Sequence, residues 1–174
     1  MKWISRIVFG LIGISYLVIA IGCAHTPKHR KTVIQSEKPK PFTVKPNEAV
    51  SSQGFIWPVE GEVLSFFGER SGRVHQGVDI SAKKGTKIYA AMAGKVIYSD
   101  NELGRYGNMI IIEHKNGYST VYAHNAKNLV KKGKRVTRGQ VIALVGQTGN
   151  ATGTHLHFEI RKGKETVNPL LYLP

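Results

Sequence analysis

Residues 107–124 read GNMIIIEHKNGYSTVYAH and predict a β-hairpin. Two short runs rich in Ile, Val and Tyr flank an Asn-Gly pair at 116–117. Short runs of β-branched and aromatic residues are typical of strands. An Asn-Gly pair between two such runs is the strongest local signal for a tight hairpin turn. The two runs should therefore pair as antiparallel strands.

The same pattern of short apolar runs continues from Gly54 to the C-terminus. Glycines separate short apolar runs, and no amphipathic helix of useful length is present. The ending VNPLLYL allows one short helical turn, with Asn168 as its cap and Pro169 at its first position. Residues 54–174 therefore predict a single all-β, antiparallel domain. The runs outside the hairpin are GEVLSFFG, TKIYAAMAGKVIYSD, GQVIALVG and HLHFEIR.

The N-terminus reads as an export signal. Basic residues precede an uncharged apolar run at 7–22, which is long for a buried helix and short of the ~20 residues of a spanning helix. Small residues before Cys23 resemble a bacterial lipobox, although Ala20 stands where Leu is commoner. We expect 1–22 to be a lipoprotein signal peptide and Cys23 to be lipidated. The alternative is an uncleaved anchor with a chance cysteine, and both export the chain.

Residues 23–53 are rich in proline and lysine and predict a disordered linker. The chain carries 25 Lys and Arg against 11 Asp and Glu, a formal net charge of +14. An exported basic protein meets anionic lipid and cell-wall polymer, so we expect no nucleic-acid partner. The alternative is a solvated basic surface without a dedicated partner. The single cysteine excludes an intrachain disulfide and a zinc site of several thiolates.

Histidines near the C-terminus are the first candidate ligands. In HLHFEI, residues 155–160, strand alternation places His155, His157 and Glu159 on one face and the apolar residues on the core face. Histidines two apart on a strand lie ~6.6 Å apart at Cα, so both rings can address one centre. An ordinary pair of surface histidines is the alternative.

His75 and Asp79, in VHQGVDIS, form a second candidate pair. On a straight strand they would lie ~13 Å apart, which is too far for one metal ion. Shared ligation therefore requires the backbone to bend between them. Gly77 is the residue that permits a bend or bulge.

His124, at the end of STVYAH, is the third candidate. Val121 and Ala123 are expected to face the core, which puts His124 on the open face of its strand. His114 ends a strand at the hairpin and is expected to be structural. Imidazole and carboxylate ligands with one position left for water describe a catalytic zinc site.

These motifs together resemble the LytM-type (M23) zinc metallopeptidases of the bacterial cell wall. The resemblance implies a β-sandwich-like fold of antiparallel sheets with the site in an open groove. It implies that His75, Asp79 and His157 hold Zn²⁺ and that a water completes the site. His124 and His155 would assist deprotonation of that water and stabilise the oxyanion, in an order left open. The implied reaction is hydrolysis of peptide bonds in the stem peptides or cross-bridges of peptidoglycan.

A lipoprotein signal, a linker and a C-terminal LytM domain also resemble the LytM lipoproteins that activate cell-wall amidases during division. Those regulators typically lack zinc-site residues and carry a wall-binding LysM repeat, for which residues 24–53 leave no room. The intact motifs therefore favour the endopeptidase, with the activator as the alternative. We expect an exported, lipid-anchored protein that faces the cell wall, and Ala24 favours the outer membrane if the host has one.

Overall fold

The structure is a computed structural model that describes residues 40–46, 48–70 and 72–174. The predicted signal peptide 1–22, Cys23 and the first part of the predicted linker lie outside the described residues. No helix in this described part of the chain is long and apolar enough to cross a membrane.

The regular structure of the described residues is almost wholly β, as predicted, apart from three short 3₁₀ turns. The turns are η1 (Gly104–Tyr106), η2 (Lys115–Gly117) and η3 (Pro169–Leu171). The strands are β1 (Phe42–Val44), β2 (Gly61–Ser65), β3 (Gly68–Arg70), β4 (Arg73–His75), β5 (Val78–Ser81), β6 (Lys87–Tyr89), β7 (Gly94–Asp100), β8 (Asn108–Glu113), β9 (Tyr118–Asn125), β10 (Lys127–Asn128), β11 (Arg135–Val136), β12 (Val141–Leu144), β13 (His155–Lys162) and β14 (Glu165–Val167).

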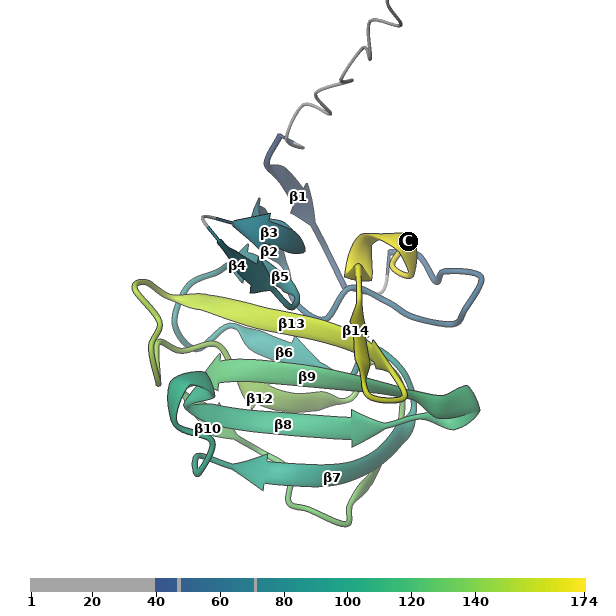
Figure 1. Cartoon of the computed structure of the whole chain (residues 1–174). Coiled ribbons are helices and arrows are strands. Elements are labelled where there is room, and N and C mark those ends of the chain that lie inside the picture. The colour runs from purple at the N-terminus through teal and green to yellow at the C-terminus, as the bar shows by residue number, and fades with distance from the viewer. Residues whose placement is uncertain (1–39, 47, 71) are drawn as a thin grey trace, which may run out of the picture. The chain divides into compact units, whose positions relative to one another are not determined.

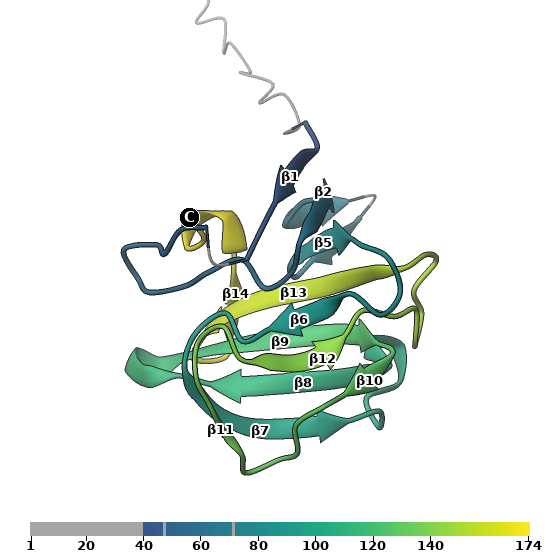
Figure 2. The same ribbon diagram turned by 180° about the vertical axis from the view of Figure 1, so that it is seen from behind.

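The strands form one large sheet and two small ones. The large sheet has the order β1-β2-β5-β13-β9-β8-β7-β11, with β14 paired to β13. The small sheets are β10-β12-β6 and the hairpin β3-β4. Both views show the β6 and β12 layer lying across one face of β13, β9 and β8 (Figures 1 and 2). All the pairings are antiparallel, so the predicted sandwich-like architecture is confirmed.

The main core lies between these two layers. The apolar residues of β13 that were predicted to face inward, Leu156, Phe158 and Ile160, are completely buried there. Ile88 of β6 and Ile142 of β12 approach the same cluster from the opposite layer. Full burial of one such side chain contributes roughly 1.5–3 kcal/mol to stability. The core thus anchors β13 firmly and leaves its other face free for polar side chains.

The faces of β9 are the reverse of the predicted ones. Tyr122 pairs with Phe158 and packs with it in the main core, at a ring separation of 5.4 Å. Val121 and Ala123 therefore share the opposite face with the polar residues of β13, where they form a small cluster with Met109. The prediction failed because both faces of β9 are buried, so its apolar residues do not mark a single core side.

Residues 42–44 differ from the predicted disordered linker, which ran to residue 53. They form β1 and pair with the edge of β2. Val44 is buried in the main core, and the ring of Phe42 meets that of Trp57 at 5.9 Å. The ordered domain therefore begins before the predicted boundary at Gly54. The signal was weak because a three-residue strand beside prolines shows little periodicity.

The two turns predicted from local sequence are confirmed. Asn116 and Gly117 have φ angles of 61° and 74°, the positive values that a tight hairpin turn requires. At the C-terminus, Pro169 opens η3, and the side chain of Asn168 accepts a hydrogen bond from the amide of Leu170 at 3.1 Å.

At Gly77, between β4 and β5, there is no room for a side chain. A Cβ at this position would lie 2.2 Å from the backbone oxygen of Phe158, which cannot move without breaking the pairing of β5 with β13. We expect Gly77→Ala to lower the free energy of unfolding by about 1–3 kcal/mol, measured by urea denaturation. Gly153→Ala is the matched control, because nothing lies within 4 Å of its Cβ position. Equal unfolding midpoints for the two variants would contradict this account.

Candidate functional site

The backbone brings His75, Asp79 and His157 together from three strands. His157 lies within β13, and its direct cross-strand partner on β5 is Asp79, so both side chains project from the same face. His75 ends β4 and approaches from the β3-β4 hairpin. The predicted bend between His75 and Asp79 is present, because the two residues belong to strands of different sheets.

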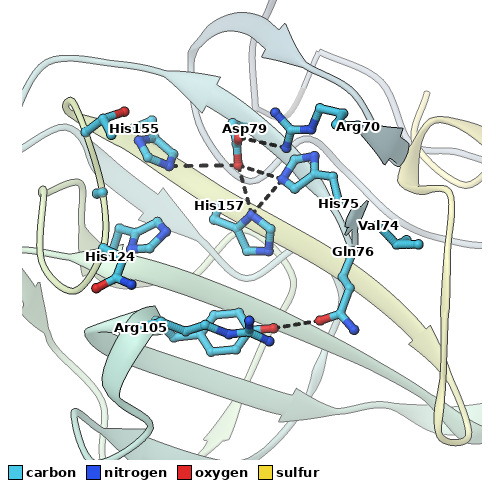
Figure 3. A pocket seen from close by; sticks show the side chains of 13 residues that line it. Arg70, Val74, His75, Gln76, Asp79, Arg105, His124, His155 and His157 are labelled. Atoms are coloured by element: carbon cyan, nitrogen blue, oxygen red, sulfur yellow. Dashed lines mark hydrogen bonds and ion pairs between the residues drawn. The ribbon is translucent and has the colours of Figure 1, made fainter. Parts of the chain in front are cut away.

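Their ligand atoms form a small triangle (Figure 3). His75 Nε2 lies 3.0 Å from Asp79 Oδ1 and 3.1 Å from His157 Nδ1. His157 Nδ1 lies 2.8 Å from the same carboxylate oxygen. Tetrahedral zinc with bonds of about 2.0 Å places its ligands about 3.3 Å apart. The triangle has about the size that three ligands of such a site would need, and all three residues line an open groove.

Each histidine of the triangle is oriented by a hydrogen bond from its other ring nitrogen. His75 Nδ1 donates a hydrogen bond to the carbonyl of Phe66 at 2.8 Å. His157 Nε2 donates to Glu159 Oε1 at 3.0 Å. Each bond commits one ring nitrogen as a donor and turns the other toward the centre, which is how proteins orient histidine ligands of metals.

Glu159 is a site residue for which the sequence predicted a face but no role. Its side chain is fully buried, and it accepts hydrogen bonds from Tyr106 Oη at 2.9 Å and from Arg161 Nε at 2.8 Å. The hydroxyl of Tyr106 also lies 2.9 Å from Gln76 Oε1. A buried carboxylate needs such partners to stay charged. Its only signal in the sequence is its place two residues after His157, on the same strand face.

Charge coupling in the triangle is strong. Burial opposes the charge on Asp79, but hydrogen bonds from His157 and His75 hold the pKa of its carboxyl well below the usual range. Burial also opposes the charge on His157, but Asp79 and Glu159 together raise its pKa to about 9. A metal ion at the triangle must displace this proton from Nδ1, so its binding is coupled to pH.

His124 and His155 form a second pair beside the triangle. Their ring centroids lie 4.8 Å apart, and the ring of His124 lies 6.0 Å from that of His157. His124 Nδ1 donates to the carbonyl of Thr148 at 2.8 Å, and His155 Nδ1 donates to the carbonyl of Gly153 at 2.9 Å. The Nε2 atoms of both rings therefore remain available for chemistry at the centre.

His124 reaches the site because of an unusual backbone conformation. Alternation from Tyr122 would point its side chain into the main core, but its φ of 64° lies in the left-handed region that non-glycine residues rarely adopt. The expected position of His124 is thus reached by a different route from the predicted one. Burial lowers the pKa of His124 to about 4, so its imidazole is neutral at neutral pH.

An open groove of about 350 Å³ surrounds both groups. The β3-β4 hairpin and the segment around η1 both line it. The first supplies Arg70 and Val74, and the second supplies Arg105 and Tyr106. The groove thus joins a triangle that could hold a metal ion, a second histidine pair and two arginines.

Glu159→Gln tests the orientation of His157. The amide keeps the volume and can still accept a hydrogen bond, but it loses the charge that favours the Nε2–H donor. We expect zinc affinity to fall roughly 10- to 100-fold, measured by competition with a chromogenic chelator. Glu165→Gln, on exposed β14, should bind zinc like the unaltered chain. Unchanged affinity in a folded Glu159→Gln variant would contradict this role.

Sequence relatives of the chain are lipoproteins and murein hydrolase activators by name. It is 42% identical over 153 residues to the uncharacterized lipoprotein YgeR of Escherichia coli K12, covering 83% of this chain and 60% of that protein. It is 48% identical over 118 residues to the murein hydrolase activator NlpD of the same organism, covering 68% of this chain and 31% of that protein. The chain thus spans 60% or less of the length of these relatives.

Solved structures similar to the domain include peptidases. A zinc containing peptidase from Vibrio cholerae superposes with a TM-score of 0.61 and 37% identity, over 69% of this chain and 39% of that chain. The catalytic domain of lysostaphin from Staphylococcus simulans gives 0.58 and 28%, over 62% and 87%. The sequence profile of Peptidase family M23 matches residues 73–169, more than half of the chain and every strand that carries the site. The chain belongs to Peptidase family M23.

Proposed function

We propose that this chain is a cell-wall lipoprotein whose M23 domain activates a murein hydrolase. One observation carries the proposal: the relatives named murein hydrolase activators are 43–48% identical to it over 118–141 residues. The aligned length is that of nearly the whole domain. The sequence motifs favoured an endopeptidase and left activation as the alternative. The relatives favour activation.

The proposed organisation of the N-terminal part follows from its sequence motifs. Residues 1–22 are the signal peptide, Cys23 carries the lipid, and a short linker leads to the ordered domain. The lipoprotein names of the relatives support this reading. The partner is a cell-wall amidase, and the chain binds peptidoglycan on the wall-facing side of the membrane.

A second function, hydrolysis of murein peptide bonds by the domain itself, is favoured by the geometry. The triangle of His75, Asp79 and His157 has the donor set and spacing of a catalytic zinc site. Bound zinc would polarise a scissile carbonyl and make an attacking water acidic. A site needed only for contact with a partner would not require this set.

The remaining chemistry falls to the second histidine pair. Neutral His124 can accept a proton through Nε2, because its Nδ1 donates to Thr148. His155, with Nε2 3.8 Å from Asp79 Oδ1, can donate a hydrogen bond to a developing oxyanion. The roles of the two histidines can be exchanged without changing the geometry.

The test is murein release from purified sacculi by the soluble chain, residues 24–174, with and without a cell-wall amidase of the same bacterium. Activation predicts more amidase product with the chain present. Hydrolysis by the domain predicts cut peptide bonds without any amidase. A chain that produces neither would overturn both functions.

A further inference from the structure

Two guanidinium groups flank the triangle from opposite walls of the groove (Figure 3). On the β3-β4 hairpin, Arg70 Nη2 lies 3.6 Å from Asp79 Oδ2, and 46% of its side chain is exposed. On η1, the guanidinium of Arg105 lies 5.7 Å from the centre of the Tyr106 ring. That ring lies 5.8 Å from the ring of His157. A peptide crossing the centre would therefore pass between the two arginines.

Each arginine is held in place yet keeps free donors. Arg70 lines the groove, and its Nη1 donates to Ser65 Oγ, so its guanidinium has further N–H groups that a ligand in the groove could use. The backbone carbonyl of Arg105 accepts from the amide of Asn150 at 3.0 Å. Tyr106, on which its guanidinium stacks, is itself fixed by Glu159. The guanidinium fork matches a carboxylate in shape as well as in charge.

The charge of the groove favours an anion. Among the described residues that line it, Asp79 is the single carboxylate, and it belongs to the triangle. Glu159 lies behind His157 and is paired with Arg161 at 2.6 Å. A divalent ion at the triangle would add further positive charge. Such a groove concentrates anionic groups through its field.

We propose that Arg70 and Arg105 form a carboxylate clamp that selects murein stem peptides with free carboxylates over amidated ones. The inference rests on the proposed function only in taking murein as the ligand. A stem peptide that ends in a free carboxylate offers the clamp a negative charge, and amidation of that group removes the charge. The clamp would serve binding to the wall whether the domain cuts murein or activates another enzyme.

Calorimetric titration tests the clamp. The zinc-loaded chain, residues 24–174, is titrated with a synthetic stem tetrapeptide that has free carboxylates and with the same peptide fully amidated. We expect the free form to bind roughly five- to tenfold more tightly. Arg105→Gln and Arg70→Gln should each remove most of that preference, because each weakens binding of the free form more than binding of the amidated form. Zinc content is measured in both variants, because Arg70 adjoins Asp79.

Arg73→Gln is the matched control. Arg73 is exposed on the same hairpin as Arg70 and does not line the groove, so its loss removes the same charge from another place. Equal binding of the two peptides, or an equal loss of preference in Arg73→Gln, would overturn the clamp. Retention of the chain on intact sacculi, measured in parallel, tests murein binding itself. Retention without carboxylate preference overturns only the clamp, and absence of retention overturns the proposed function too.

Discussion

Replacing His157 by alanine is expected to abolish zinc binding. His157 supplies Nδ1 to the triangle from a buried ring. Loss of a residue that only orients a ligand costs roughly 10- to 100-fold in metal affinity, and loss of the ligand itself should exceed that range. Zinc per chain is measured by mass spectrometry of metals after dialysis, with affinity from chelator competition.

His124→Asn is the control for this experiment. Asparagine tolerates the left-handed backbone that His124 adopts, so the variant removes the imidazole with little added strain. Its zinc content should equal that of the unaltered chain, since His124 lies outside the triangle. Full zinc loading of His157→Ala would refute the assignment of the triangle as the metal site.

The second large effect concerns turnover by the domain itself. In His124→Asn and His155→Asn, peptide-bond cleavage should fall by about 10²- to 10⁴-fold while zinc remains bound, because the proposed roles of these histidines are to move a proton and to stabilise developing charge. Cleavage is followed by mass spectrometry of fragments released from amidase-free sacculi. A chelator should stop cleavage by the unaltered chain, and added Zn²⁺ should restore it.

Retention of the full rate in both variants would show that the histidine pair takes no part in the reaction. Cleavage that persists in the presence of a chelator would show that the activity does not depend on metal bound at the triangle. Because both variants are tested for zinc and for their melting temperature, a loss of rate cannot be confused with a loss of fold.

Much of the fold followed from local patterns. The hairpin at Asn116 and Gly117 depends on two positive φ angles that this residue pair adopts easily. The faces of β13 followed from alternation, because one side of that strand is wholly apolar. Because both faces of β9 are buried, its sequence did not show which face meets the main core. β1 has only three residues, which is too short for an alternating apolar pattern to be recognised. Those features depend on tertiary packing that a single strand does not encode.

The site was predictable to a similar extent. The sequence indicated that His75 and Asp79 would need a bend, and the chain changes sheets between them. It placed Glu159 beside His157 but gave no sign that Tyr106 and Arg161 would meet it, since those contacts join distant segments. The left-handed backbone conformation of His124 could not be predicted either, because no sequence pattern indicates a positive φ at a histidine.

The central claim is activation, and one measurement tests it most directly. Sacculi are incubated with a cell-wall amidase of the same bacterium, with His124→Asn chain 24–174, and with both, and amidase products are counted by mass. This variant separates activation from cleavage by the domain. The account predicts that the mixture releases far more amidase product than the amidase alone. Equal release by the mixture and by the amidase alone would contradict it.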